Sequence, residues 1–291
     1  MICATARGGS ADGCHRPAAA LRPHIVNYTG FRTRFPAPRR RLELPTGYVT
    51  LVLSFGDGLW VSRAGGPATA RPRPVSRAMV SGPRTGAAIG VHAGAVHGLE
   101  VNLSPLGAYR LFGIPVAHLQ DTDVDLAEVL GPGGRHLTER LHALGSWEAR
   151  FGLLDALFTA RLDRGPAASP EVRAALARLW ADSGSLARAT AETGWGARHL
   201  RARFREQVGL SPKGVARVFR LQHALRLLAA GTPPARVAAA CGYHDQAHLG
   251  REVKALTGLA PSRFTALRAG LAPGSALDRM PGRITSVLLS G

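Results

Sequence analysis

One pattern occurs twice in the C-terminal half of the chain, and it restricts the fold more than any other feature. The first copy runs from Ser185 to Phe204 and the second from Pro234 to Val253. Each is an Ala-rich stretch, then a glycine (Gly194 or Gly242), an aromatic residue and a few polar residues, then a second helical stretch that carries Arg or Gln among apolar positions. This pattern is typical of a helix-turn-helix, in which the second helix enters the major groove of DNA.

The second stretch of each copy separates apolar from polar positions. Leu200 and Phe204, and likewise Leu249 and Val253, are four residues apart and predict one buried face. The opposite face carries arginine, glutamine and histidine, and Arg and Gln are side chains that recognise base edges. We therefore expect these candidate DNA-contacting residues: Arg198, Arg201, Arg205, His244, Gln246, Ala247, Gly250 and Arg251.

The stretch between the two copies, about Pro212 to Ala230, predicts one long amphipathic helix. Its apolar stripe consists of Val215, Val218, Phe219, Leu221, Leu225 and Leu228. Such a helix would fix the two units relative to each other. Two units on one rigid piece would address successive major-groove segments, about 34 Å apart on one side of B-DNA.

The charge of the chain is strongly basic. It holds 37 Lys+Arg and 19 Asp+Glu, a net charge of +18. Divided after Ala167, the C-terminal part has 18 basic and 7 acidic residues (+11), and the rest has 19 and 12 (+7). A polyanion-binding region explains the C-terminal excess. The alternative explanation of the charge is a GC-rich genome, which raises Arg content everywhere, above all as the source of the N-terminal excess. A separate alternative for the function is a basic protein that binds DNA without sequence preference.

Cysteine usage and hydropathy indicate a cytoplasmic protein. Cys3, Cys14 and Cys241 show no paired spacing, so we expect neither a disulfide framework nor a zinc cluster. No run of 18 apolar residues predicts a membrane span. The N-terminal stretch lacks the apolar segment of a secretory signal.

The N-terminal half consists of short β-branched and aromatic runs bounded by Gly, Pro and Asp. Six such runs predict a small antiparallel barrel or sandwich. They are His24–Phe31, Tyr48–Phe55, Leu59–Ser62, Ser76–Ser81, Ala87–His92 and Gly98–Leu103. Ser104 and Pro105 then start a helix that ends at Gly113.

Two amphipathic stretches, about Asp125–Leu144 and Ser146–Leu162, predict a helical hairpin after the strands. It would pack on the strands, form a dimer interface, or couple to the C-terminal region. The fold class is thus α+β with two domains: residues 1–20 disordered, 21–164 the β-rich sensor or dimerisation domain, 165–270 the all-α DNA-binding domain, and 271–291 a flexible tail.

The C-terminal region resembles the DNA-binding domain of the AraC/XylS family of bacterial transcription regulators. The resemblance rests on Leu200-x-x-x-Phe204, Gly209-x-Ser211-Pro212, Arg220 with Ala224 and Leu227-Leu228, Val237-Ala to Leu249, and Gly258 to Phe264. It implies groove-facing positions at Arg198, Arg201 and Ala202 in the first unit, and at Gln246, Ala247, Gly250 and Arg251 in the second. The sequence departs from the family at Val253, where Phe is usual, and at Ala202 and Gly250.

The N-terminal half resembles, more loosely, the sensor halves of actinobacterial members, over Val101 to Gly113. The resemblance implies double-stranded DNA as the partner. It leaves open a small-molecule effector, a homodimer and, for an activator, RNA polymerase. No cofactor is implied.

An enzymatic or metal-binding N-terminal domain is the alternative from another class. His92, His97 and Glu100 stand on a predicted strand, where cupin-type barrels carry metal ligands. Residues on one strand face need even spacing, which His97 breaks relative to His92. A DNA-repair alkyl acceptor would need an activated thiolate, which Cys3 and Cys14 do not suggest. We therefore expect no metal, no catalytic residue and no enzyme.

Overall fold

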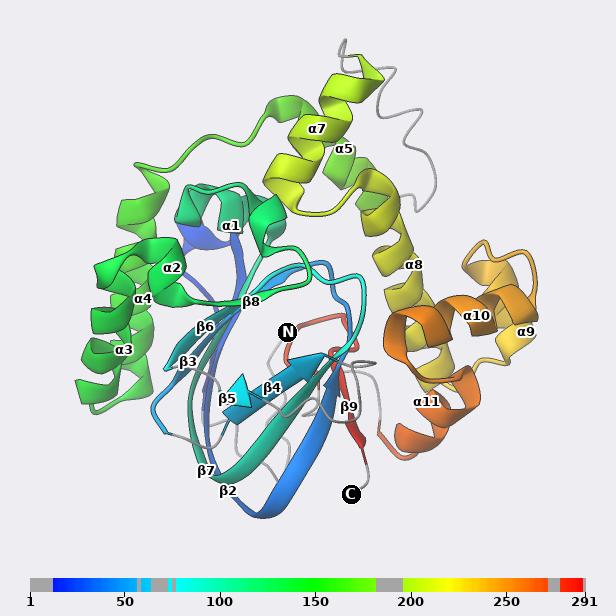
Figure 1. Ribbon diagram of the computed structural model, residues 1–291, viewed down its shortest axis with the longest axis horizontal. Coiled ribbons are helices and arrows are strands. Elements are labelled where there is room, and N and C mark those ends of the chain that lie inside the picture. Colours follow the sequence, from blue (N-terminus) through cyan, green and yellow to red (C-terminus); the bar gives the residue numbers. More distant parts are fainter. Residues whose placement is uncertain are drawn as a thin grey trace.

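The computed structural model describes residues 13–56, 59–63, 73–74, 77–181, 196–271 and 278–289. An antiparallel sheet with its own helices forms the N-terminal region, and the C-terminal region is helical (Figure 1). The expected α+β class with two structural regions is confirmed. Among the described residues, no helix is long and apolar enough to cross a membrane.

The sheet is built around two long strands. Its order is β1-β2-β7-β3-β6-β8, with β4 and β5 attached beside β7 and β9 beside β2, and every pair is antiparallel. The strands are β1 (Gly13–His15), β2 (Ile25–Glu43), β3 (Val49–Ser54), β4 (Leu59–Arg63), β5 (Arg73–Pro74), β6 (Ala78–Ser81), β7 (Ala88–Leu103), β8 (Asp123–Asp125) and β9 (Ser286–Leu289).

Strands β2 and β7 are longer than the sequence pattern predicted. The last two expected runs are one strand, and β2 continues far beyond Phe31 through Pro36 and Pro38. The β2–β7 register shifts between Phe35 and Arg39. The two prolines therefore lie where the β2–β7 pairing is irregular. Proline has no backbone N–H group, and at this irregularity no regular β-sheet hydrogen bond requires one.

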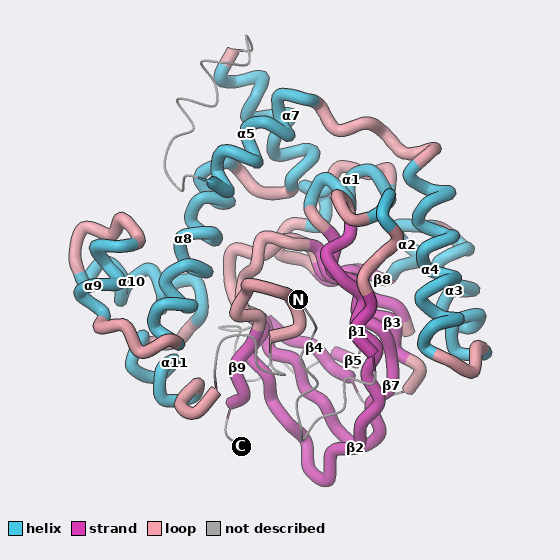
Figure 2. The backbone as a smooth tube through the Cα atoms, turned by 180° about the vertical axis from the view of Figure 1, so that it is seen from behind, coloured by secondary structure: helices cyan, strands magenta, loops and turns pink. Residues whose placement is uncertain are grey.

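Helices cover one face of the sheet, as Figure 2 shows from behind. They are η1 (Ala19–Leu21), α1 (Pro105–Phe112), η2 (Val116–Leu119), α2 (Leu126–Leu130), α3 (Pro132–Ala143) and α4 (Trp147–Leu162). Phe151 and Phe158 of α4 pack with Leu51 and Leu99 of the sheet in one core. The expected hairpin of α3 and α4 therefore packs on the strands, since burying its apolar stripe stabilises both layers.

The helical region has two further cores that share one helix. Its helices are α5 (Pro170–Ala181), α7 (Ala197–Val208), α8 (Pro212–Ala229), α9 (Pro234–Ala240), α10 (Gln246–Thr257) and α11 (Pro261–Leu267). The first half of α8 packs with α5 and α7, and its second half packs with α9, α10 and α11. The supporting helix expected around Ser185 and the turn glycine Gly194 lie outside the described residues.

The C-terminal segment is structured where the sequence led us to expect a flexible tail. Ser286–Leu289 forms β9, which pairs with Arg40–Glu43 of β2. Ile284 and Val287 are buried in the same core as α8 and α10. Arg268, just after α11, forms a two-pronged ion pair with Asp278 at 2.7 and 3.0 Å, and both side chains are fully buried. This segment therefore joins the helical region to the sheet.

Part of the N-terminal stretch expected to be disordered is also ordered. Gly13–His15 pairs with β2, and the 3-10 helix η1 begins at Ala19. The division of the chain near residue 165 stays a prediction, because the two regions share a core.

Candidate DNA interface

The second helix-turn-helix unit consists of α9, a turn and α10. Gly242 in the turn has a φ of +68°, a conformation that glycine adopts without a side-chain penalty. The amide of Tyr243 donates to the carbonyl oxygen of Ala238 at 2.9 Å, and the Tyr243 ring is buried. Asp245 caps α10 by accepting a hydrogen bond from the amide of His248 at 2.6 Å. The turn and the cap together fix where α10 begins.

Helix α10 is held on α8 by apolar packing and by one ion pair. Leu249 and Val253 are fully buried, so the valine at the family's usual Phe position still packs in the core. Arg217 of α8 donates two hydrogen bonds to Glu252 of α10, at 2.7 and 3.0 Å. The hydrogen bond from Arg217 lowers the pKa of Glu252, whose carboxylate is therefore charged at neutral pH. Arg220 lies over the Tyr243 ring, 5.4 Å from its centre.

The opposite face of the second unit is open to solvent. Gln246, Ala247 and Arg251 are exposed, and Gly250 between them is half-buried. The side chain of His244 is 88% exposed, and its Nδ1 lies 3.1 Å from Asp245. The structure thus brings the expected residues of the second unit onto one accessible surface.

The first unit shows the same separation of faces on α7. Leu200 and Phe204 are fully buried, whereas Arg198, Arg201 and Arg205 are exposed. Ala202, which the resemblance placed in the groove, is exposed as well and offers no hydrogen-bond donor. We call α7 and α10 the reading helices. Contact of their exposed residues with DNA remains a prediction.

Buried glutamines that the sequence analysis missed secure both units. Gln207 of α7 donates to the Ser169 hydroxyl at 2.8 Å and accepts from the Ser169 amide at 2.9 Å. Gln222 of α8 donates to the carbonyl oxygens of Pro45 and Ile284, and accepts from the Ile284 amide. Both glutamines are fully buried. A polar residue within an otherwise apolar stripe was the available signal.

Helix α7 also lies directly against the sheet region. Gly209 ends α7 with a φ of +87°. A Cβ atom at this position would lie 2.6 Å from Cγ of Pro83 and 2.9 Å from Cγ1 of Val116. These distances are shorter than van der Waals contact, so a residue with a Cβ atom would fit here only if Pro83 or Val116 moved. The first unit is therefore seated on the N-terminal region, and Figure 1 shows α7 next to α1.

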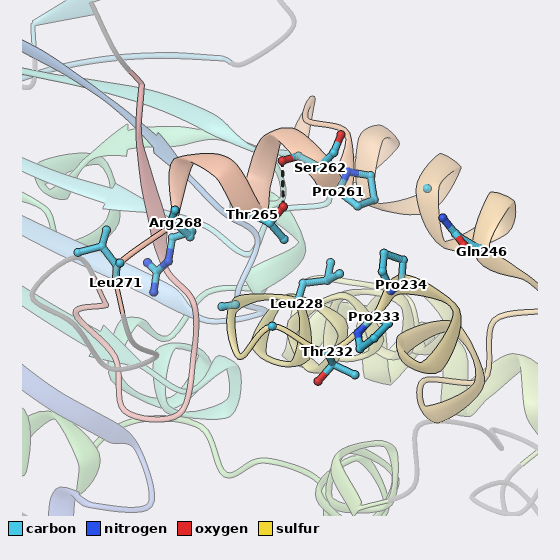
Figure 3. A pocket seen from close by; sticks show the side chains of 15 residues that line it. Leu228, Thr232, Pro233, Pro234, Gln246, Pro261, Ser262, Thr265, Arg268 and Leu271 are labelled. Carbon is cyan, nitrogen blue, oxygen red and sulfur yellow. Dashed lines mark hydrogen bonds between the residues drawn. The ribbon is translucent and has the colours of Figure 1, made fainter.

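A pocket of about 780 Å³ lies beside α10 (Figure 3). Gln246 and Gly250 line it on one side, and Pro233 and Pro234 face α11 across it. The Thr265 hydroxyl donates to the Ser262 carbonyl oxygen at 2.9 Å within α11. Among the described residues that line it, the only charged one is Arg268, which is already paired with Asp278. The pocket thus adjoins the predicted reading surface without supplying a free charge.

The candidate metal residues of the N-terminal region do not come together. Burial, followed by Arg279 and Arg41, lowers the pKa of His92 to about 4. Glu100 is buried and pairs with Arg279 at 2.7 Å. The His97 ring packs edge-on against Trp147 of α4, with ring centres 5.6 Å apart. The described residues contain no group of three His, Cys, Asp or Glu that would hold a metal ion.

Comparison with protein families gives two matches. Residues 189–266 match a helix-turn-helix domain family, and residues 14–125 match a family described as a domain of unknown function (DUF6597). The first range contains both reading helices, and the second contains most of the sheet. No curated protein matches the chain.

Among solved structures, ToxT from Vibrio cholerae is similar in several forms. One, at 1.65 Å resolution, is 10% identical over 84% of this chain and 98% of that chain, with a TM-score of 0.46. ToxT bound to an unsaturated fatty acid is 8% identical over 89% and 99%, with a TM-score of 0.44. At these values the likeness says nothing about what this chain binds.

The helix-turn-helix match spans the two units whose exposed Arg- and Gln-bearing helices are described above. These units also carry the motif that the AraC/XylS family shares. The chain therefore has, at its C-terminal end, the AraC-type helix-turn-helix domain of a DNA-binding transcription regulator, joined to an N-terminal domain of a family of unknown function.

Proposed function

We propose that the protein is a sequence-specific transcription regulator that reads two successive major-groove segments, one with each reading helix. The observation that carries the proposal is the arrangement of Arg198, Arg201 and Arg205 on the exposed face of α7, and of Gln246 and Arg251 on that of α10. Each helix buries its other face in a core that includes part of α8.

The chemistry of these side chains suits base recognition. Arginine presents a planar fork of donors that matches O6 and N7 of guanine, and glutamine matches N6 and N7 of adenine. Arg203, the fourth arginine of α7, is not in the predicted DNA-contacting set. Its Nη1 atom forms an ion pair with Oε2 of Glu206, three residues further along α7, at 2.6 Å. The other three arginines of the α7 face form no ion pair with any described residue.

The length of α8 suits two adjacent sites. Its 18 residues span about 27 Å at 1.5 Å per residue. Successive major-groove segments on one side of B-DNA lie about 34 Å apart, and the reading helices extend beyond the two ends of α8. Because both cores and Gln222 restrain α8, the spacing between the units would be nearly fixed.

The N-terminal domain would sense a small molecule or form a homodimer, and would pass its state to the DNA-binding units. Support comes from the shared core, in which Leu42 and Leu44 of the sheet region pack with α8 and α10. An activator of this kind would also contact RNA polymerase. We place the protein in the cytoplasm, where its DNA is, and assign it no catalytic role.

Genome-fragment selection with the purified full-length protein, at about 150 mM salt, tests the proposal. At this salt concentration nonspecific binding is already weakened. We expect enrichment of a motif with two half-sites about 10 bp apart. Random DNA of the same length is the reference for the specificity ratio.

Recovery of fragments without a shared motif, with affinity that falls steeply with salt, would contradict sequence-specific reading. That result would favour the alternative of a basic protein that binds DNA nonspecifically. Repeating the selection with the Arg201→Ala variant tells the two apart, because a base-reading contact changes the recovered motif and a phosphate contact does not.

A further inference from the structure

The positive charge of the N-terminal part is concentrated in its strands. Residues 13–103 hold 12 Arg, no Lys and three acidic residues (+9), whereas residues 104–164 hold six Arg and eight acidic residues (−2). Two of the three acidic residues, Glu43 and Glu100, form ion pairs with Arg279 at 2.8 and 2.7 Å. A GC-rich genome raises Arg content but does not separate arginine from acidic residues, so composition alone does not explain this distribution.

Strands β2 and β7 form a two-stranded ribbon with open edges over the middle of their length. Strand β1 pairs with β2 as far as Gly30, and β9 pairs with β2 from Arg40 onward. On the other side, β4 pairs with β7 as far as His92, and β3 pairs with it from Gly98 onward. Between these points, among the described residues, the two strands pair only with each other. Figure 1 shows β2 and β7 bending together at the lower end of the molecule, beyond the helices.

We call residues 31–40 of β2 and 91–97 of β7 the arginine ribbon. It contains no Asp or Glu, and it carries four exposed arginines: Arg32, Arg34, Arg39 and Arg40. None of the four forms an ion pair with any described residue. The next residue, Arg41, points to the opposite side of the strand, is buried and lies 3.4 Å from Glu43. The exposed arginines are therefore separate from the buried ion pairs around Arg279.

Local contacts restrict part of the arginine ribbon. The guanidinium of Arg39 lies over the Phe35 ring, 5.0 Å from its centre, and the His92 ring lies 6.0 Å from the same ring. Pro36 and Pro38 fix the backbone φ angle between Phe35 and Arg39. A side chain and a backbone that are already restrained lose less conformational entropy when a partner binds.

Protection of the open edges is the other explanation for these residues. Charged residues and prolines on an exposed strand edge prevent it from pairing with another chain. That protection requires charge of either sign, and a mixture of acidic and basic residues would supply it. The arginine ribbon has one sign only, and the repulsion among its cations would be relieved by a negatively charged partner.

Double-stranded DNA is the anion that this surface fits. DNA carries one negative charge per about 1.7 Å of its axis, whereas residues 104–164 of a second copy have a net charge of only −2. The ribbon also adjoins the second helix-turn-helix unit. Arg40 lies opposite Leu289 of β9, and Val287 of β9 is buried in the same core as α10.

We propose that the arginine ribbon binds phosphates of the DNA that flanks the half-site of α10. The planar fork of arginine pairs with phosphate oxygens, and such contacts position a protein on DNA without reading its sequence. The inference rests on the proposed function for the DNA itself. It adds a third DNA contact, which the N-terminal domain supplies.

The salt dependence of binding to random-sequence DNA counts these phosphate contacts. In fluorescence anisotropy with the full-length protein, Arg34→Gln/Arg40→Gln should bind a long random duplex several-fold more weakly. The slope of log K against log salt concentration should become shallower by about 1.8, since each phosphate contact contributes about 0.9. Arg135→Gln/Arg140→Gln removes two exposed arginines of α3 in the same domain, and it should leave the slope unchanged. Circular dichroism verifies that both double variants are folded.

Extended probes locate the contact on the DNA. The selected motif is lengthened by about 20 bp, two turns of the double helix, beyond one half-site or beyond the other. The half-site whose sequence preference changes with Gln246→Ala identifies the α10 side. Extension on that side should raise the affinity of the unmodified protein several-fold, and it should not raise the affinity of Arg34→Gln/Arg40→Gln.

Three outcomes would overturn the proposal. They are a slope that is unchanged in Arg34→Gln/Arg40→Gln, an equal change in the α3 control, and an equal gain from both extensions. An unchanged slope would mean that the arginine ribbon is a solvated edge or binds an acidic protein. Failure of the proposed function would look different, because the slope on random DNA can be measured even if no motif is recovered.

Discussion

The two reading helices differ in both their charge and their support. Helix α7 holds four arginines and one acidic residue, whereas α10 holds one arginine, one lysine and one acidic residue. The residues of α10 that we expect to face the groove also include Ala247 and Gly250, which offer no side-chain donors. We therefore expect the first unit to supply more of the electrostatic affinity, and the second to depend more on Gln246 and on the shape of the DNA.

The two reading helices also differ in the parts of the molecule against which they pack. Helix α7 is in direct contact with the sheet region through Gly209, Pro83 and Val116. Helix α10 is carried by α8, α9 and α11, and this group meets the sheet region through the C-terminal segment and through a core that includes Leu42 and Leu44. A change in the N-terminal domain would thus reach the first unit through the close contact at Gly209, and the second through this shared core. Five variants test this comparison.

The largest expected effect is on the support of the second unit. Asp278→Asn leaves the fully buried guanidinium of Arg268 without its charge partner, and breaking such a pair costs about 3–5 kcal/mol of unfolding free energy. Denaturant unfolding measures the loss, with Glu139→Gln as an exposed control. Hydrogen exchange should rise in α11 before α7. A loss below about 1 kcal/mol would show that the C-terminal segment does not secure the second unit.

The support of the first unit is tested at Gly209. Gly209→Ala and Gly231→Ala both place a Cβ on a left-handed backbone, which costs about 1–2 kcal/mol. Only the Cβ at position 209 meets Pro83 and Val116, so a further loss of about 1–3 kcal/mol is expected there. Thermal unfolding of both variants gives the difference. Equal losses would mean that α7 is not tightly seated on the sheet region.

The difference in DNA recognition is tested by Arg201→Ala and Gln246→Ala. Each should reduce affinity for the selected site by about 1–3 kcal/mol if it removes a base contact. Arg201→Ala should also weaken binding to random DNA, because it removes a charge, whereas Gln246→Ala should leave random binding nearly unchanged. Fluorescence anisotropy at two salt concentrations measures both. An equal loss on both DNAs for Arg201→Ala would assign that residue to phosphate.

The smallest expected effect concerns the Arg217–Glu252 ion pair. Arg217 lowers the pKa of Glu252 below its ordinary value of 4.5, so the pair stabilises the fold at pH values above 4.5. That contribution is lost as the pH falls through the lowered pKa. Because the pair is half-exposed, Glu252→Gln should cost less than about 1 kcal/mol at pH 7. Unfolding curves of the variant and the unmodified protein should converge at acid pH; a constant gap would contradict the account.

Local patterns in the sequence predicted the helical region well. Ser104 and Pro105 start α1 as expected, and α8 begins at Pro212 as expected. Ser104 and Ser211 each accept a hydrogen bond from the amide three residues on. The spacing of Leu200, Phe204, Leu249 and Val253 identified the buried faces of both reading helices, because amphipathic periodicity depends on the helix alone.

Features that depend on distant parts of the chain were missed. The partner of β9 lies more than 240 residues earlier in β2, and nothing in the local pattern of 286–289 specifies it. The hydrogen bond between Gln222 and Pro45 is also long-range in sequence. Arg268 and Asp278 are only 10 residues apart, but their buried ion pair forms only when the surrounding core has assembled.

The most direct test of the two-unit account is the spacing of its DNA site. Inserting 5 bp between the two half-sites of the selected motif turns one of them by about half a turn of the double helix. With α8 fixing the units, the protein should lose at least tenfold in affinity, approaching that for a single half-site. Unchanged affinity for the lengthened site would contradict the account, because it would mean that only one reading helix contacts DNA or that α8 does not fix their spacing.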